Sequence, residues 1–192
     1  MQKGRLEAFS DGVIAIIITI MVLEMKVPSQ AGGNLEALRP FISIFFSYVL
    51  SFIYIGIYWS NHHHLLHTVK HVNGGILWAN LHLLFWLSLI PFTTAWLGEN
   101  RFDSLPAALY GVVLFCAAVA YFILTKTILA THGRDSILAK AIGSDFKGKI
   151  SIIIYLAAIL LAFVNSLYSN LLYCLVAIMW LVPDRRIEKV LN

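Results

Sequence analysis

Six apolar segments run along the chain, separated by short stretches in which polar residues gather. They lie at about residues 7–27, 40–62, 75–98, 106–130, 149–166 and 168–183. The first four reach the ~20 residues that a helix needs to cross the hydrocarbon core of a bilayer. The last two are short and almost contiguous, which indicates a helical hairpin. Its expected bend contains Asn165, Ser166, Ser169 and Asn170. The pattern predicts an all-α membrane protein with six transmembrane helices in one domain, residues 1–192.

A smooth aliphatic stripe follows one side of the first segment. Residues 12–23 are apolar at every position except Thr19. At about 100° per residue, five aliphatic side chains fall on one side of a helix, with Thr19 at the edge of this stripe. They are Val13, Ile16, Ile20, Leu23 and Val27. Such a stripe is typical of bundle core or of lipid contact. The alternative is a pore wall, in which copies of this helix from several subunits meet around an axis.

Asp11 lies just inside one end of the first segment, on nearly the opposite side from the aliphatic stripe. A carboxylate at the centre of a membrane helix costs roughly 2.5–3.5 kcal/mol on insertion scales, and less near an end. Ser10 and Asp11 either bond to neighbouring helices and fix the tilt of this helix, or form a cation or proton site. Their position away from the stripe favours the structural role. The expected partners, of which Trp and His carry N–H donors, are Trp59, Asn61, His62 and His63.

Composition places the chain in a membrane. It is 59% hydrophobic and 12% charged, whereas soluble domains carry about 45–50% apolar and 25% charged residues. The net charge of +4 does not indicate nucleic-acid binding, because the basic residues lie between apolar segments. With the N-terminus inside, eleven of the 14 Lys and Arg residues fall on the inner side. This bias predicts cytoplasmic N- and C-termini.

The histidines near the end of the second segment suggest a rival function. His63, His67 and His71 are spaced i, i+4 and i+8, so they would share a helical face if the helix continued. Such spacing can bind zinc or another transition metal, as in a secondary transporter or metal-ion carrier that uses the His62–His71 cluster. However, no acidic residue lies between residues 62 and 73, and transporter sites usually lie near mid-membrane. No metal site is therefore predicted.

Two further classes of chemistry have no support in the sequence. Cys116 and Cys174 lie in apolar segments without a Cys or His at ligand spacing, so we interpret them as packing residues. No nucleophile–base pair or H-E-x-x-H motif is present, so we expect neither an enzyme nor a catalytic residue. Pro91, inside the third segment, predicts a kink in which Thr93 and Thr94 satisfy freed backbone groups.

Three motifs on the first three segments carry a resemblance to a known family. They are Arg5-x-x-x-Phe9-Ser10-Asp11, then Tyr58-Trp59-Ser60-Asn61-His62-His63, and then Leu77-Trp78-Ala79-Asn80-Leu81 with Ile90-Pro91-Phe92-Thr93. In these motifs the chain resembles the endosomal and lysosomal potassium-channel family, in its short bacterial form. The resemblance covers residues 5 to about 183, although the second half matches only in hydropathy. His64 departs from it, because the relatives usually carry Arg there.

The resemblance implies a passive, potassium-preferring cation channel in the bilayer of a bacterial inner membrane. It implies a homotetramer whose first helices line the pore, with K⁺ as the permeant ion and no cofactor. No TVGYG-type loop is present for a carbonyl filter. Ile16, Ile20 and Leu23 would instead form rings that block hydrated ions by dewetting. Family resemblance places the narrowest point at Ile16 and polar discrimination near Thr19.

We predict that Asp11→Ala or Asp11→Asn disrupts assembly more than ion selectivity, because Asp11 faces away from the stripe. Size-exclusion chromatography of the purified variants would report assembly, and ion flux would report selectivity. A correctly assembled variant with altered ion preference would contradict the structural role.

Overall fold

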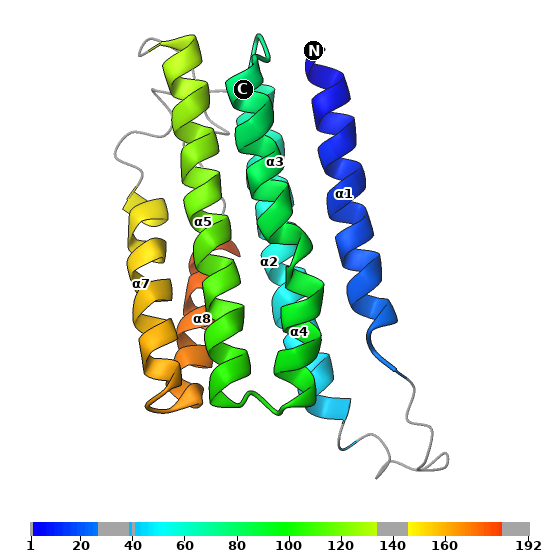
Figure 1. Cartoon of the computed structure of the whole chain (residues 1–192), viewed down its shortest axis with the longest axis vertical. Helices are drawn as coiled ribbons and strands as arrows, with labels where there is room; N and C mark the ends of the chain where they lie inside the picture. Colours follow the sequence, from blue (N-terminus) through cyan, green and yellow to red (C-terminus); the bar gives the residue numbers. More distant parts are fainter. Residues whose placement is uncertain (1, 27–38, 40, 134–145, 182–192) are drawn as a thin grey trace.

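Helices make up almost all of the chain that the structure describes, which is a computed structural model covering residues 2–26, 39, 41–133 and 146–181. They run roughly along one axis, with α1 at one side of the bundle (Figure 1). In chain order the helices are α1 (Lys3–Leu23), α2 (Phe41–His67), α3 (Gly74–Ser88), α4 (Ile90–Glu99), α5 (Ser104–His132), α7 (Phe146–Ala162) and α8 (Ser166–Leu181). No strand occurs in this part of the chain. The all-α prediction is confirmed.

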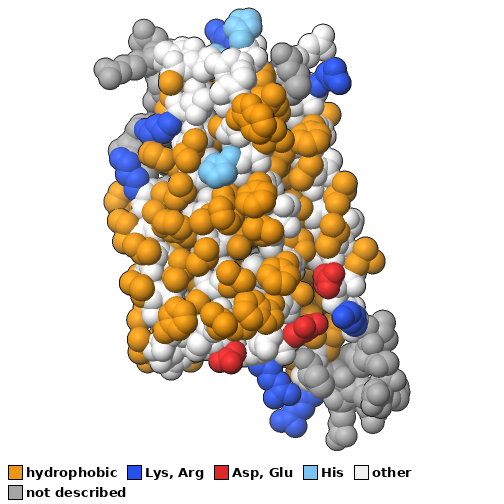
Figure 2. All heavy atoms as spheres, in the orientation of Figure 1, with side chains coloured by type: hydrophobic (Ala, Val, Ile, Leu, Met, Phe, Trp, Pro, Cys, Tyr) orange, Lys and Arg blue, Asp and Glu red, His pale blue; other side chains and the backbone are white. Residues whose placement is uncertain are grey.

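Four stretches are long and apolar enough to cross a membrane. They are α1, α2, α5 and the 26-residue stretch Gly74–Glu99 that contains α3 and α4. Apolar side chains cover most of the visible face of the molecule, and charged side chains lie toward its two ends (Figure 2). This distribution is the one that a hydrocarbon environment requires, because a charged group is costly at its centre. The helices α7 and α8 have only 17 and 16 residues.

Near Pro91, where a kink was predicted, the third span is interrupted at the single residue Leu89. Helix α3 ends at Ser88 and α4 begins at Ile90, with Pro91 in the first turn of α4. The division fits the chemistry of proline, which lacks an N–H and is tolerated where a helix begins. Thr93 and Thr94 bond backbone carbonyls in this turn, as expected, and the Thr94 hydroxyl donates to Ile90 O at 2.7 Å.

Hydroxyl groups join α2, α4 and α5 on the α4 side of this interruption. Thr94 on α4 donates to the Ser51 hydroxyl on α2 at 2.6 Å. The Ser51 hydroxyl also lies 3.0 Å from the Tyr110 hydroxyl on α5. All three side chains are buried, so these bonds satisfy groups that have no access to water. Close helix contact accompanies them at Gly111, where an added Cβ would overlap the buried Tyr173 hydroxyl of α8.

The bend between α7 and α8 is shorter than the sequence suggested. Helix α7 ends at Ala162 and α8 begins at Ser166, so Ser169 and Asn170 lie inside α8. Asn165 explains the early restart, because its side-chain oxygen accepts the N–H of Leu167 at 2.9 Å and so satisfies a free donor at the helix start. Val27, which the predicted stripe included, lies outside the described residues.

Helix α1 packs against α2, α3 and α4, and its contacts with the remaining described helices are few. Its side chains separate into a buried row and an outward surface. The buried row is Leu6, Ser10, Ile14, Ile17 and Met21. Their spacing of three and four residues is that of one helical face. Because the row covers only one face, most of the remaining surface of α1 is left without a partner in its own subunit.

The stripe on α1 and its supporting network

The aliphatic stripe of α1 points away from the helices of its own chain. Ile16 is 58% exposed and Leu23 is 77% exposed, and Ile20 and Thr19 are exposed as well. Val13 is the exception, since it is half-buried and packs against the core. The stripe is therefore narrower than predicted, and it is not the core face of α1. Packing in the core of the subunit is therefore excluded for Ile16, Ile20, Leu23 and Thr19, and the other two uses, lipid contact and a pore wall, stay open.

Thr19 is the polar residue of this outward surface. Its hydroxyl donates to the backbone oxygen of Ile16 at 2.8 Å. This bond occupies the hydroxyl proton, so the oxygen has lone pairs that can face outward from the helix. An oxygen held in this way can act as a cation ligand, whereas a hydroxyl that points its proton outward cannot.

Asp11 is bound to α2 on a different side of α1. The indole Nε1 of Trp59 donates to its Oδ1 at 3.1 Å. The sequence predicted both the partner helix, α2, and Trp59 as one of the partner residues. Both side chains are exposed in the single chain. The bond fixes the position of α1 relative to α2 and leaves the outward stripe without a carboxylate.

Ser10, Asn80 and His62 form a buried network between α1, α3 and α2. The amide Nδ2 of Asn80 donates to the Ser10 hydroxyl at 2.9 Å, and Ser10 donates to Leu6 O at 2.8 Å. The ring Nε2 of His62 lies 2.6 Å from the amide oxygen of Asn80. Since an amide oxygen only accepts, Nε2 carries the hydrogen. All three side chains of the network are at most 1% exposed.

Asn80 is the residue that the sequence reasoning missed. It appeared in the third motif, but no role was assigned to it. The sequence did contain an indication of this role, because an amide in an apolar segment must find hydrogen-bond partners within the protein. Asn80 supplies both a donor and an acceptor, so a single side chain can join two other helices.

The remaining motif residues are not gathered at Asp11. Arg5 is exposed and Phe9 is 52% exposed on the outward surface of α1. The amide of Asn61 donates to Ile57 O on its own helix at 2.8 Å. His63 lies against the Trp59 ring, with ring centroids 6.3 Å apart. Of the four expected partners, only Trp59 bonds Asp11 in the described part of the chain.

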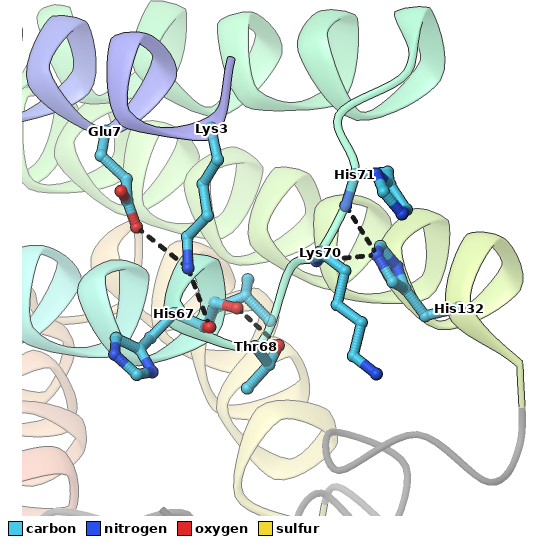
Figure 3. A network of polar contacts seen from close by, with 8 residues as sticks. Lys3, Glu7, His67, Thr68, Lys70, His71 and His132 are labelled. Carbon is cyan, nitrogen blue, oxygen red and sulfur yellow. Dashed lines mark hydrogen bonds and ion pairs between the residues drawn. The ribbon is translucent and has the colours of Figure 1, made fainter. Parts of the chain in front are cut away.

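The histidine stripe does not extend to His71. Helix α2 ends at His67, and His71 lies in the connection to α3. The backbone N–H groups of Lys70 and His71 donate to the Nε2 of His132, at 3.1 and 3.3 Å (Figure 3). The i, i+4, i+8 row required the helix to continue to His71, and this condition is not met. Among the described residues, no group of three or more His, Cys, Asp and Glu side chains is placed to hold a metal ion.

Lys3 joins the start of α1 to the end of α2. Its ammonium donates to the backbone oxygen of His67 at 2.9 Å and lies 3.6 Å from a carboxylate oxygen of Glu7 (Figure 3). The last carbonyls of a helix lack intrahelical donors, so a lysine there satisfies one of them and matches the negative end of the helix dipole. With the Asp11–Trp59 bond, this contact holds the N-terminal half of α1 against the C-terminal half of α2.

We predict that Asn80→Ala destabilises the subunit, because it leaves the buried His62 Nε2–H without an acceptor and Ser10 without its donor. Each such loss costs roughly 1–3 kcal/mol. Thermal unfolding in detergent would measure the effect. The matched control is Asn100→Ala, which removes an exposed amide bonded to Trp96 O. Equal melting temperatures for the two variants would contradict the role of the network.

Comparisons with known proteins identify the same family that the sequence resembles. Residues 5–91 match the family model of the endosomal/lysosomal potassium channel TMEM175. A potassium channel of Chryseobacterium sp. is 56% identical over 192 residues, which cover all of this chain and 99% of that protein. An endosomal/lysosomal proton channel TMEM175 of Gallus gallus is 29% identical over 151 residues, 71% of this chain but only 30% of that protein.

A solved structure supports the fold as well. The crystal structure of a lysosomal potassium-selective channel TMEM175 homologue from Chamaesiphon minutus superposes with a TM-score of 0.77 at 27% identity, covering 95% of this chain and 97% of that one. With four stretches able to span a bilayer, the chain is an integral membrane protein. It belongs to the family of the endosomal/lysosomal potassium channel TMEM175.

Proposed function

We propose that this chain is the subunit of a potassium-preferring cation channel, in which four copies surround a pore lined by α1. Permeation is passive. Each subunit crosses the membrane six times, with α7 and α8 as two short spans, and both termini face the cytoplasm of a bacterial cell. The relatives support potassium as the ion, since the Chryseobacterium protein that matches over the whole chain is named a potassium channel.

The outward aliphatic stripe on α1 is the observation that carries this proposal. A helix at the edge of a bundle has no partner within the subunit for Ile16, Ile20 and Leu23, yet its other side is bound by polar contacts to α2 and α3. Such contacts hold the rotation of α1 about its own axis, and so fix which side chains it presents outward. They suit a helix whose orientation must be held while its other side meets symmetry mates. A closed ring of identical chains supplies that symmetry.

The stripe can also control ion passage. Four copies of Ile16 around an axis form an apolar ring, and Ile20 and Leu23 form further rings one to two turns along the same side. A narrow apolar ring expels water, so a hydrated ion cannot pass while the ring is closed. The constriction is therefore hydrophobic and needs no carbonyl filter. Ion preference then depends on the nearest polar side chain, Thr19.

We predict that Ile16→Asn increases potassium leak into proteoliposomes or relaxes selectivity, because an amide ring holds water in the constriction. An increase of about ten-fold needs a barrier lower by only about 1.4 kcal/mol. Stopped-flow flux with a potassium-sensitive dye would measure it, with sodium and proton gradients in parallel.

The matched control is Ile153→Asn on α7, where the native side chain is 62% exposed, against 58% for Ile16. Equal leak in the two variants would contradict a pore position for Ile16. Flux that requires a proton or metal gradient would instead support the rival reading, a secondary transporter or metal-ion carrier. A pathway that carries protons and excludes potassium would overturn the choice of ion.

We further predict that Thr19→Val lowers the preference for potassium over sodium toward unity, because it replaces the hydroxyl oxygen with a methyl group of similar size. Thr19→Ser keeps the oxygen and should keep most of the preference. Reversal potentials under bi-ionic conditions would report both. Unchanged selectivity in Thr19→Val would remove Thr19 from the permeation path.

A further inference from the structure

A positive charge lies at the beginning of the outward side of α1. Arg5 and Leu23 are 18 positions apart, which is five whole turns of an α-helix, so their side chains leave α1 in the same direction. Ile16 is 11 positions from Arg5, close to three turns. All three side chains are exposed in the single chain. Arg5 therefore shares the side of α1 that carries Ile16 and Leu23.

The two basic side chains in the first turn of α1 are used differently. The Lys3 ammonium turns toward α2, where it bonds the backbone oxygen of His67 and lies 3.6 Å from Glu7 (Figure 3). The Arg5 guanidinium makes no hydrogen bond or ion pair with any residue that the structure describes. A guanidinium stays charged at every physiological pH. Lys3 thus anchors the helix, whereas Arg5 presents its charge outside the subunit.

The carboxylates in this half of α1 do not neutralise Arg5 within the subunit. Glu7 and Asp11 leave the helix at about 200° and 240° from Arg5, on roughly the opposite side. Glu7 lies beside Lys3, and Asp11 accepts the indole N–H of Trp59. From Arg5 to the end of α1, the outward side carries no acidic side chain. The positive charge at its beginning is therefore uncompensated in the described subunit.

The outward side of α1 is smooth and small between Phe9 and Ile16. Gly12 and Ala15 are exposed there, and a Cβ added at Gly12 would meet no atom of the subunit within 4 Å. In a ring of four α1 helices, four glycines leave a wider path than four isoleucines. Potassium ions that come from the cytoplasm therefore pass Arg5 with their hydration water and lose it only at Ile16.

We propose that Arg5 determines the direction in which potassium passes most easily, as a ring of four positive charges at the cytoplasmic mouth of the pore; this inference rests on the proposed tetramer. The ring lowers the potassium concentration at that mouth. Four unit charges at a distance of about 8 Å lower it roughly three-fold at physiological ionic strength. Ions that enter from outside reach Ile16 before they reach Arg5. The channel therefore carries inward potassium current more readily than outward current.

Single-channel recording of the purified full chain in planar bilayers tests this proposal. With about 0.15 M KCl on both sides, the wild type should pass roughly three-fold more current in one direction than in the other at opposite voltages of equal size. In about 1 M KCl the ratio should approach one, because the Debye length falls to about 3 Å. Equal currents in the two directions at the lower salt concentration would overturn the proposal.

Substitutions at Arg5 separate its charge from a structural role. Arg5→Gln should bring the current ratio close to one, Arg5→Glu should reverse it, and Arg5→Lys should keep it, since only the charge matters at the mouth. The matched control is Lys70→Gln, which removes an exposed charge from the α2–α3 connection and should keep the ratio. If Arg5→Lys lost the asymmetry together with Arg5→Gln, Arg5 would instead hold the subunits together by a specific ion pair, and the proposal would be wrong.

A second measurement works on a channel that already conducts. In Arg5→Cys, a cationic thiol reagent that cannot cross the membrane should act from one side only, and it should reduce the current of potassium that enters from that side. An anionic reagent should raise the same current. The wild type should not respond, because Cys116 and Cys174 lie in apolar segments. Modification without any change in current would contradict a position of Arg5 at the mouth.

The failure of this inference can be told from the failure of the proposed function. Wild-type channels that conduct potassium passively and respond to Ile16→Asn, but keep their current ratio in Arg5→Gln, would remove only the role of Arg5. A wild-type protein without passive potassium conduction would overturn both.

Discussion

The absence of water in the hydrocarbon core is the constraint on which this structure depends. Between membrane helices, apolar packing lacks the driving force that it has in water, so hydrogen bonds between polar side chains matter for position. Asn80 meets this condition by bonding α1 and α2 at once. Thr94, Ser51 and Tyr110 do the same for α4, α2 and α5. The helices of the bundle are therefore held in position by a few buried amides and hydroxyls.

This orientation explains how α1 can present an apolar surface outward. Leu6, Ile14 and Ile17 face the bundle, and the Asp11–Trp59 bond lies on a third side. The outward side makes no polar contact with the other described helices, and beyond Arg5 its polar side chain is Thr19. A helix with three different sides can be anchored on two of them and still present an apolar third side outside its own subunit.

Sequence reasoning recovered what depends on periodicity and charge. The helical class and the Trp59 partner of Asp11 follow from spacing along a helix, whereas spacing alone left open whether Ile16 faces the bundle core, lipid or a pore. The sequence did not show which residues that are distant in the chain come together in the fold. Nothing in the spacing showed that Asn80 would face both Ser10 and His62, since these residues are far apart in the chain. The sequence also left open whether the second helix continues to His71, because no proline marks its end.

The division of the third span at Leu89 has a mechanical consequence. The network that holds α1 is attached to α3, whereas the hydroxyl chain through Ser51 is attached to α4. Two rigid rods in series, joined at a point without continuous helix bonding, can change their mutual angle more easily than one unbroken rod. The two halves of the third span are therefore anchored separately, α3 to α1 and α2 through Asn80, and α4 to α2 and α5 through Thr94 and Ser51.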